Sequence, residues 1–506
     1  MARVLFVFSI DGHRRFDRRP LSAAAVQLGI SYISALLKAH GHETRLVVLE
    51  SRRGAAEFPL VTERLRAFEP TLVCHTAVAT QYPFIVRVAE HVRALRPNLP
   101  QLIGGVHVSL NPEQALRDGF DAVCVGEGEH PTLELAAALD AGLVPTGIAN
   151  LWLRRGGDVQ RNATRPFVRP LDSLPPPDRR MWDEWLDHSR PPVHTVLLGR
   201  GCPYQCAYCC NHALKKLAAG PYVRMRTPEA VVREIESLAA PSDAAQSMYL
   251  EVETFMLDSD WTESFCDRLA AFNARRRRPI RFGANVRVTP HIEVERFFAA
   301  FAQANIQSVN IGLESGSERI RRDVLRRYYS NDDVLRTVRA ARTHGMQVAL
   351  YNLIGLPGET WRDFLETARM NRLCRPDAHR TSIFYPYPGT ALHGVCREQG
   401  LLGAGLPTDR ERKQAALDLP GFPRRRIQEC HDYFDVYVAH ANPMWCRLHV
   451  LWRRCTEWVD RHTRGLPGYW RVRRGIAAGQ RLVRGGVRAT VDAVASHVRT
   501  PRELGG

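Results

Sequence analysis

The first 145 residues alternate short apolar runs with segments whose apolar residues recur every three or four positions. Such runs are typical of buried strands, and the wider spacing is typical of amphipathic helices. The expected strands are residues 4–8, 44–49, 71–74, 101–103 and 122–125, and the expected helices are 24–40, 57–68, 84–95 and 131–139. This alternation predicts a doubly wound parallel sheet, a Rossmann-like domain over residues 1–145.

A second series of strand and helix signals begins at residue 194. The expected strands are residues 195–198, 247–250, 280–282, 308–311, 347–350 and 381–384, with helices such as 228–238, 293–304 and 331–344 between them. Six such units predict a partial (βα)6 barrel over residues 194–395. The segment 146–193 contains Leu174-Pro175-Pro176-Pro177, and this density of proline predicts a linker between two α/β domains.

Residues 396–506 form a region rich in Arg and Trp with a mostly helical pattern. Residues 424–506 alone hold 16 Arg and 7 acidic residues, and the whole chain has a net charge of +17. A positive charge of this size favours an anionic substrate, nucleic acid or an acidic membrane surface, or reflects an arginine-rich composition. We expect the region to pack on the barrel, with peripheral membrane contact as an alternative. Nucleic acid is less favoured, because the sequence contains no recognisable RNA-binding module.

The chain is expected to be cytoplasmic, which decides how its cysteines are interpreted. It lacks the run of ~18 apolar residues that a membrane-spanning helix needs. Its first apolar run is followed by Asp11 and His13 and has no small-residue cleavage site. In a reducing cytosol, a tight group of cysteines indicates metal binding or catalysis, not disulfides. Eight of the 12 cysteines are scattered singly and are expected to be small buried side chains.

Four cysteines lie within nine residues, directly after the expected strand 195–198. They are Cys202, Cys206, Cys209 and Cys210. Three thiolates on a [4Fe–4S] cluster leave one iron open to a ligand. Zinc is the main competitor, but structural zinc sites usually use two well-separated ligand pairs, and no second pair is evident. The sequence therefore predicts an iron–sulfur cluster held by Cys202, Cys206 and either Cys209 or Cys210.

The segment Cys202-Pro-Tyr-Gln-Cys206-Ala-Tyr208-Cys209 resembles the signature of the radical S-adenosylmethionine (radical SAM) superfamily. The resemblance implies that the open iron binds SAM, which is reductively cleaved to a 5′-deoxyadenosyl radical that abstracts hydrogen from a small-molecule substrate. It favours Cys209 as the third ligand, because Cys209 follows the aromatic Tyr208. It also implies an external electron donor, such as a flavodoxin, a ferredoxin or a reductase.

Later segments are similar to the branch of this family that has an N-terminal cobalamin-binding domain. Glu253 matches the acidic residue that holds the SAM amino group, with Glu251 as the alternative. The residues that the resemblance assigns to SAM are Tyr208, Glu253, Asn285, Arg287, Glu314 and Gly355. They lie at expected strand ends, where barrel enzymes place their chemistry. No catalytic side chain is predicted, although Tyr351, Asn352, His379 and Tyr385 lie near strand ends and are candidates for substrate contact.

In the N-terminal domain, the resemblance implies a cobalamin site at the carboxyl ends of the strands, where ligands of such sheets bind. The candidates are Gly104, Gly105, His107, Gly126 and Gly128. The Asp-x-His-x-x-Gly motif that supplies a cobalt ligand is absent, because Asp11-Gly12-His13 has the wrong spacing. We therefore expect His107 to be structural or to lie at the edge of the pocket.

The resemblance leaves two classes of reaction open. The first is cobalamin-dependent methylation of an unactivated carbon in specialised metabolism, such as antibiotic biosynthesis. The second is radical chemistry without methyl transfer: dehydration of a sugar diol of the aminoglycoside type, by a lyase, or cyclisation or rearrangement. A third class, nucleic-acid modification or binding, depends only on the basic charge and on the aromatic residues of the C-terminal region.

Overall fold

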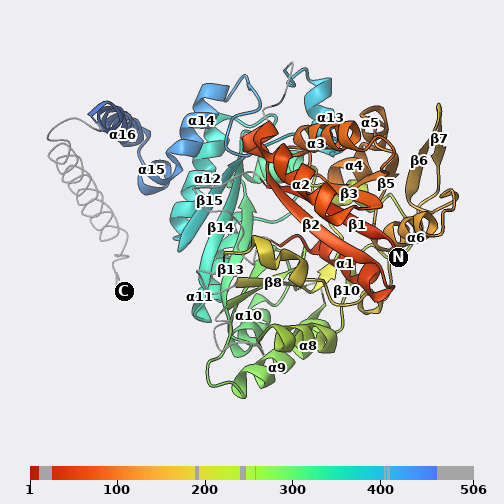
Figure 1. Ribbon diagram of the computed structural model, residues 1–506. Helices are drawn as coiled ribbons and strands as arrows, with labels where there is room; N and C mark the ends of the chain where they lie inside the picture. The colour runs from red at the N-terminus through yellow and green to blue at the C-terminus, as the bar shows by residue number, and fades with distance from the viewer. Residues whose placement is uncertain are drawn as a thin grey trace, which may run out of the picture.

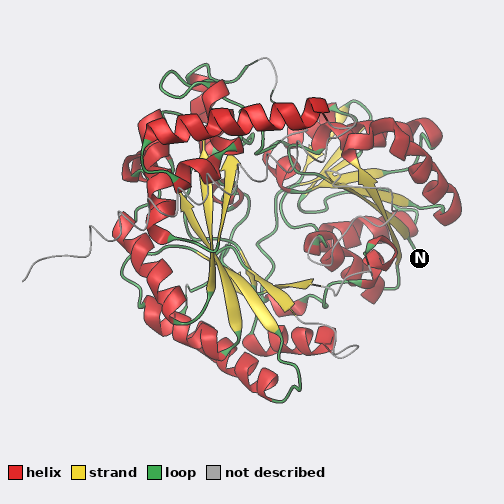
Figure 2. Ribbon diagram, turned by 90° about the vertical axis from the view of Figure 1, so that its left-hand side faces the viewer, coloured by secondary structure: helices red, strands yellow, loops and turns green. Residues whose placement is uncertain are grey.

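The computed structural model describes residues 1–10, 26–187, 193–239, 247–256, 258–403, 406 and 411–463. Two sheets lie side by side with helices outside them, and the C-terminal helices continue from the second sheet (Figures 1 and 2). Among the described residues, no helix is both long enough and apolar enough to span a membrane.

The N-terminal sheet has seven strands in the order β2-β1-β3-β4-β5-β6-β7. The strands are β1 (Arg3–Ile10), β2 (Glu43–Glu50), β3 (Leu72–Thr76), β4 (Gln101–Gly104), β5 (Ala122–Cys124), β6 (Leu151–Arg155) and β7 (Asp158–Arg161). The first five are parallel, as in the predicted doubly wound sheet, whereas β6 and β7 pair antiparallel at one edge. The apolar run of β1 is buried because helices cover both faces of the sheet.

Helices of this domain match the expected segments and add several short ones. They are α1 (Leu28–Ala39), α2 (Phe58–Phe68), α3 (Tyr82–Leu95), α4 (Val106–Leu110), α5 (Pro112–Arg117) and α6 (Glu129–Asp140), with 3-10 turns at η2 (Ser51–Glu57), η3 (Leu171–Ser173) and η4 (Arg180–Trp185). The segment expected to be a linker contributes β6, β7 and η4. Its Trp182 is fully buried, and the indole nitrogen donates to Ser31 Oγ at 2.8 Å.

The second sheet has six parallel strands in the order β15-β14-β13-β12-β11-β8, which confirms the partial barrel. The strands are β8 (Val193–Leu197), β11 (Ser247–Glu251), β12 (Arg281–Val286), β13 (Ile306–Glu314), β14 (Gln347–Ile354) and β15 (Ala378–Ile383). The accompanying helices are α8 (Pro228–Ala239), α9 (Ser259–Ala274), α10 (Val294–Gln303), α11 (Asn331–Thr343), α12 (Trp361–Cys374) and α13 (Ala391–Glu398), with a π-helical turn η5 (Ile320–Val324). Buried and half-buried residues alternate along β14, because one face packs on helices while the other lines the barrel interior.

The C-terminal region is helical in its described part, as predicted. It contains α14 (Arg424–Asp432), α15 (Phe434–Ala439) and α16 (Pro443–Thr463). Aromatic residues join α15 and the segment before α14 to α12, since Phe364 of α12 contacts Phe422, Phe434 and Tyr437. Helix α16 follows α15 at the left of Figure 1.

Candidate active site

The cysteine loop leaves a short two-stranded sheet formed by β9 (Gly199–Arg200) and β10 (Arg224–Met225). Gly201 has a φ of +87°, and a Cβ there would lie 2.1 Å from the Tyr222 carbonyl oxygen. Only glycine fits this close approach of two chain segments. The loop therefore starts from a fixed position, and it ends at the short helix α7 (Asn211–Leu214).

Each of the three preferred cysteines has a polar partner, and the partners of Cys202 and Cys206 come from other parts of the fold. Cys202 Sγ lies 3.3 Å from the Thr254 hydroxyl, and both atoms are buried. Arg287 Nη1 donates to Cys206 Sγ at 3.1 Å, and Asn211 Nδ2 donates to Cys209 Sγ at 3.5 Å. Hydrogen-bond donors and a nearby guanidinium stabilise thiolates, which are the form that binds iron. The surroundings of the loop thus fit a cysteine-held cluster.

Cys209 and Cys210 have opposite thiol properties. The hydrogen bond with Cys210 and those from Asn211 lower the pKa of Cys209 to about 6, whereas the same Cys209–Cys210 bond raises the pKa of Cys210. This difference favours Cys209 as the thiolate, in agreement with the sequence spacing. Within the described ranges, no three His, Cys, Asp or Glu side chains are placed so that they could hold one metal ion together. The ligand set therefore stays a prediction.

Tyr208 and Glu314 meet in a buried cluster with Arg327. The Tyr208 hydroxyl donates to Glu314 Oε1 at 3.0 Å, and Arg327 Nη1 donates to that hydroxyl at 3.0 Å while forming an ion pair with Glu314. Nothing in the sequence indicated that Arg327 belongs to the site, because it is one of several basic residues in its segment. The three residues connect the cysteine loop to the end of β13, so Glu314 has a clear role in positioning Tyr208.

Glu253 and Arg287 lie beside the cysteine loop from different strands. Glu253 Oε2 accepts a hydrogen bond from Asn211 Nδ2 at 3.1 Å, and Arg287 stacks on Tyr204 with its guanidinium carbon 3.7 Å from the ring centroid. The alternative acidic residue, Glu251, is more buried. Burial and the neighbouring Glu253 charge raise its pKa to about 7. Both carboxylates thus stay candidates for the SAM amino group.

Asn285 belongs to a polar group inside the barrel that the sequence did not indicate as a unit. Its Oδ1 accepts hydrogen bonds from the Tyr249 hydroxyl and, at 3.3 Å, from Asn310 Nδ2. Asn310 Nδ2 also donates to the Tyr249 hydroxyl at 2.7 Å. Asn285 and Asn310 are register partners on β12 and β13, which is why they meet. Strand register would have been needed to find this group.

Gly355 turns the chain at the end of β14. It has a φ of +78°, and a Cβ there would lie 3.0 Å from Ile427 Cγ2 of α14. The Gly355 and Leu356 amides donate to Glu359 Oε2, and burial raises the pKa of Glu359 to about 8. The Leu-Pro-Gly-Glu segment is therefore a tight turn stabilised from within, next to the barrel mouth.

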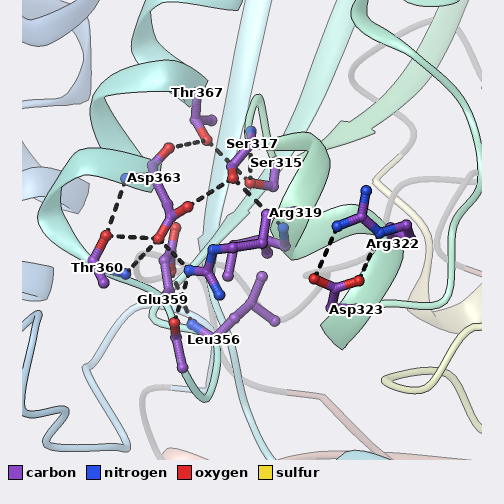
Figure 3. A network of polar contacts seen from close by, with 12 residues as sticks. Ser315, Ser317, Arg319, Arg322, Asp323, Leu356, Glu359, Thr360, Asp363 and Thr367 are labelled. Atoms are coloured by element: carbon purple, nitrogen blue, oxygen red, sulfur yellow. Dashed lines mark hydrogen bonds and ion pairs between the residues drawn. The ribbon is translucent and has the colours of Figure 1, made fainter.

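A polar network fixes the segment after Glu314 against the start of α12 (Figure 3). Asp363 accepts hydrogen bonds from Ser317 Oγ at 2.7 Å and from the Thr360 amide at 2.9 Å, and it pairs with Arg319. A Cβ on Gly316 would lie 2.3 Å from the Glu366 carbonyl oxygen. The Glu-Ser-Gly-Ser sequence thus reflects close packing on α12.

Of the substrate-contact candidates, Asn352 faces away from the barrel interior. Its amide exchanges hydrogen bonds with Asn371 of α12 at 3.2 and 2.7 Å, in a buried position. His379 packs against Phe434, with 5.2 Å between ring centroids, and Tyr385 lies beside Tyr387. The expectation for Asn352 is therefore wrong, because the alternation along β14 directs it to the helix side.

The glycines of the N-terminal domain bring chain segments together around the strand ends. Gly104 ends β4, and Gly105 has a φ of +104° with a hypothetical Cβ 2.7 Å from the Ala77 carbonyl oxygen. The Gly126 amide donates to Ser109 Oγ at 3.0 Å, and a Cβ on Gly128 would lie 3.0 Å from Ile33 Cδ1. Their role in cobalamin binding stays a prediction.

His107 lies on α4, directly after Gly105, and is 6% exposed. Its ring centroid lies 4.4 Å from that of Tyr82. Burial lowers the pKa of the imidazole, and the Gln114 side chain offsets this shift only in part. Neither ring nitrogen forms a hydrogen bond of ordinary length with another described residue. A buried imidazole at the strand ends fits the edge of a bound corrin. The segment Asp11-Gly12-His13 lies outside the described residues.

Two acidic residues next to these glycines, Glu127 and Glu129, connect the domains, a role that the sequence analysis missed. Arg200, two residues before Cys202, donates to Glu127 at 2.9 Å and to Glu129 at 2.6 Å. Arg224 donates to both oxygens of Glu127. The signal was present as the alternation Gly-Glu-Gly-Glu. These ion pairs hold the end of β5 against the start of the cysteine loop.

Three further contacts bring the strand ends of the first sheet to the mouth of the barrel. Helix α4, which carries His107, packs against α7, which follows Cys210. A Cβ on Gly389 would lie 2.7 Å from Leu110 Cβ, and Thr80 donates to Glu411 at 2.8 Å. The proposed cobalamin site and the cysteine loop are therefore neighbours.

Comparison with known families identifies both halves of this junction. Residues 196–370 match the radical SAM superfamily, and residues 22–136 match the B12 binding domain. The chain therefore contains a radical SAM domain behind a B12-binding domain, which is the domain order of the family branch that the sequence resembles. The family resemblance and the enzymatic class predicted from the sequence are thereby confirmed. So are the cofactors, a [4Fe–4S] cluster, SAM and cobalamin.

Curated relatives of this radical SAM protein have several activities. An anaerobic magnesium-protoporphyrin IX monomethyl ester cyclase of Rubrivivax gelatinosus is 24% identical, over 72% of this chain and 65% of its own length. An uncharacterized methyltransferase of Pyrococcus horikoshii is 26% identical over 79% and 84%. The cytidylyl-2-hydroxyethylphosphonate methyltransferase of Streptomyces wedmorensis is 21% identical over 80% and 84%.

Solved structures share the fold of this radical SAM protein. The methyltransferase TsrM of Kitasatospora setae, with cobalamin and a [4Fe–4S] cluster bound, has a TM-score of 0.63 at 20% identity, covering 80% of this chain and 76% of its own. The cobalamin-dependent radical enzyme OxsB has a TM-score of 0.67 at 14% identity, covering 99% and 82%. The second match extends over the C-terminal region as well.

Proposed function

We propose that this radical SAM enzyme transfers a methyl group to an unactivated carbon of a small molecule in specialised metabolism. The observation that carries the proposal is the junction of α4 with α7, beside the Arg200 ion pairs. Methyl transfer to a carbon that has lost a hydrogen requires the methyl donor and the hydrogen-abstracting group to reach one substrate in one cavity. A shared junction supports that arrangement.

When bound, the cluster supplies an electron to SAM and cobalamin supplies a methyl group. The residues of this chain bind and orient these groups. Arg287 and Asn211 donate to the Cys206 and Cys209 sulfurs, which stabilises thiolates. The Tyr208–Glu314–Arg327 cluster keeps the loop in place at the end of β13.

Inside the barrel, Tyr249, Asn285 and Asn310 offer hydrogen-bonding groups to a polar ligand. Glu251 has a pKa of about 7, so its carboxyl can hold or release a proton at neutral pH. A buried carboxyl of this kind suits contact with the amino group of SAM or with a polar substrate. The substrate we propose is therefore a small polar molecule.

Methyl transfer is also supported by the names of two curated relatives, whose matches cover most of both chains. Radical cyclisation is the second candidate, because the match to the protoporphyrin ester cyclase is also extensive. That match spans less than two thirds of the cyclase. Dehydration of a sugar diol is supported only by the family resemblance seen in the sequence.

The test uses the reconstituted enzyme with cobalamin, dithionite, SAM bearing a deuterated methyl group, and a panel of candidate small molecules. We expect a product that carries the deuterated methyl group, together with 5′-deoxyadenosine and S-adenosylhomocysteine. A product without the label, formed with 5′-deoxyadenosine alone, would contradict methylation. A product with fewer hydrogens than its substrate would then indicate cyclisation, and a product that has lost water relative to its substrate would indicate dehydration.

A further inference from the structure

Helix α16 exposes a row of large apolar side chains. Met444, Trp445, Leu448, Leu451 and Trp458 are 59%, 56%, 51%, 56% and 57% exposed. They are five of the 14 large hydrophobic side chains that are exposed in the described part of the chain. Single exposed apolar residues are normal on a protein surface, but a concentration on one helix marks an interaction site.

These side chains share one face of the helix. Successive residues advance by about 100° around a helix, so the five positions fall within an arc of about 140°. The exposed Cys455 and the half-buried Trp452 lie within the same arc. The opposite face is already occupied, because Cys446 and Val450 are buried in the C-terminal core. The apolar arc therefore points away from the protein.

Arginines border this arc along one side. Arg447, Arg454 and Arg461 are spaced seven residues apart, which places them in one line along the helix. The segment that follows, residues 464–506, contains nine Arg and two acidic residues. Acidic groups are located on the side of the helix that faces the protein, where Asp435 pairs with Arg453 and Glu429 with Arg454.

We propose that α16 binds the surface of an anionic lipid bilayer, with its apolar arc between the lipid headgroups. Helices with an aromatic and aliphatic face bordered by basic residues bind in this way, and Trp favours the interface of the membrane. The 21-residue helix is about 31 Å long and lies parallel to the membrane. The basic segment after it adds attraction to acidic headgroups.

This charge pattern favours a lipid surface over a second copy of the chain. An antiparallel two-fold contact through the arc would bring the arginine rows of both copies close together, and like charges repel. In Figure 1, α16 lies at the left, whereas α4, α5 and α6 of the N-terminal domain lie at the right. Binding through α16 would therefore leave the active site accessible from the aqueous side.

The test measures sedimentation of the full chain with vesicles of phosphatidylcholine alone or mixed with phosphatidylglycerol. We expect binding to the mixed vesicles, little binding to phosphatidylcholine, and about tenfold weaker binding for Leu448→Glu. Leu143→Glu is the matched control. Leu143 is 63% exposed and follows α6, which lies at the right of Figure 1, away from α16, so its substitution leaves binding unchanged.

Arg447→Ser is expected to weaken binding to the mixed vesicles, and added salt is expected to weaken wild-type binding. Unchanged thermal unfolding of Leu448→Glu, followed by circular dichroism, shows that the fold is retained. Equal binding of Leu448→Glu and the wild type would overturn the proposal, because residues 464–506 would then act alone. A wild-type dimer that Leu448→Glu dissociates, detected by light scattering, would also overturn it.

Discussion

At the scale of single residues, the site depends on groups that hold the cysteine loop from outside it. Arg287 and Thr254 contact the Cys206 and Cys202 sulfurs from the segments after β12 and β11, while Asn211, directly after the loop, contacts Cys209. The sequence predicted the cysteines and Arg287, since a short spacing and a strand end are visible along the chain. Thr254 and Arg327 could not be predicted in the same way, because their roles depend on which strands are neighbours.

Cys209 and Cys210 provide the first residue-scale prediction. Cys209→Ala is expected to lose the [4Fe–4S] iron and its visible absorbance after anaerobic reconstitution, because it removes the thiolate that Asn211 stabilises. Cys210→Ala is the matched control and is expected to retain the iron content of the wild type. Loss of iron in Cys210→Ala with retention in Cys209→Ala would reverse the assignment.

Glu359 provides a pH-dependent prediction. Burial raises the pKa of its carboxyl to about 8, whereas a glutamate in the unfolded chain has a pKa of about 4.3. Between these values the folded state keeps a proton that the unfolded state has released. Stability is therefore greatest below about pH 4.3 as far as this group is concerned, and it falls as pH rises to about 8, by up to about 1.4 kcal/mol per pH unit.

The measurement is the free energy of unfolding by urea at several pH values for the wild type and for Glu359→Gln. The amide oxygen of Gln can still accept the Gly355 and Leu356 hydrogen bonds. We expect the substitution to flatten the dependence on pH in this range. An identical dependence in both proteins would show that Glu359 does not titrate as described.

At the scale of elements, most strands and the main helices followed from the sequence. The runs in β1, β2 and β13 are apolar enough to be recognised, and the expected helix 57–68 corresponds closely to α2. The hairpin β6–β7 was not predicted, because the nearby prolines indicated a linker. The short helices α4 and α7 were also missed, since one turn carries too little periodicity to detect.

Gly201 leads to a prediction about the loop as an element. Gly201→Ala would place a Cβ 2.1 Å from Tyr222 O, in a backbone conformation that alanine rarely adopts, so it is expected to displace the loop and reduce bound iron. Gly220→Ala is the matched control, with a φ of +90° and its nearest neighbour 3.9 Å away. Equal iron content in the two variants would contradict this account.

At the scale of the whole molecule, the two domains are joined by partly buried ion pairs whose residues are far apart in the sequence. Arg200 and Glu127 are 73 residues apart, and Arg224 and Glu127 are 97 apart. No periodicity or spacing reveals such pairs in advance. The domain order could be predicted from the sequence, but the face on which the domains meet could not.

Arg200→Met tests this junction. Removing one partner of a buried ion pair leaves Glu129, which is 3% exposed, without compensation, so we expect a loss of about 3 kcal/mol in the free energy of unfolding. Arg165→Met breaks the more exposed pair with Glu134 and is expected to cost less than about 1 kcal/mol. Urea denaturation compares the two, and equal losses would contradict a special role for Arg200.

The central claim is that the cysteine loop generates a radical from SAM in a chain that also binds cobalamin. The most direct measurement is the formation of 5′-deoxyadenosine from SAM and dithionite by the reconstituted, cobalamin-loaded wild type, with Cys206→Ala as the comparison. The account predicts 5′-deoxyadenosine from the wild type and none from Cys206→Ala. No 5′-deoxyadenosine from a wild type with a complete cluster, or equal amounts from both proteins, would contradict it.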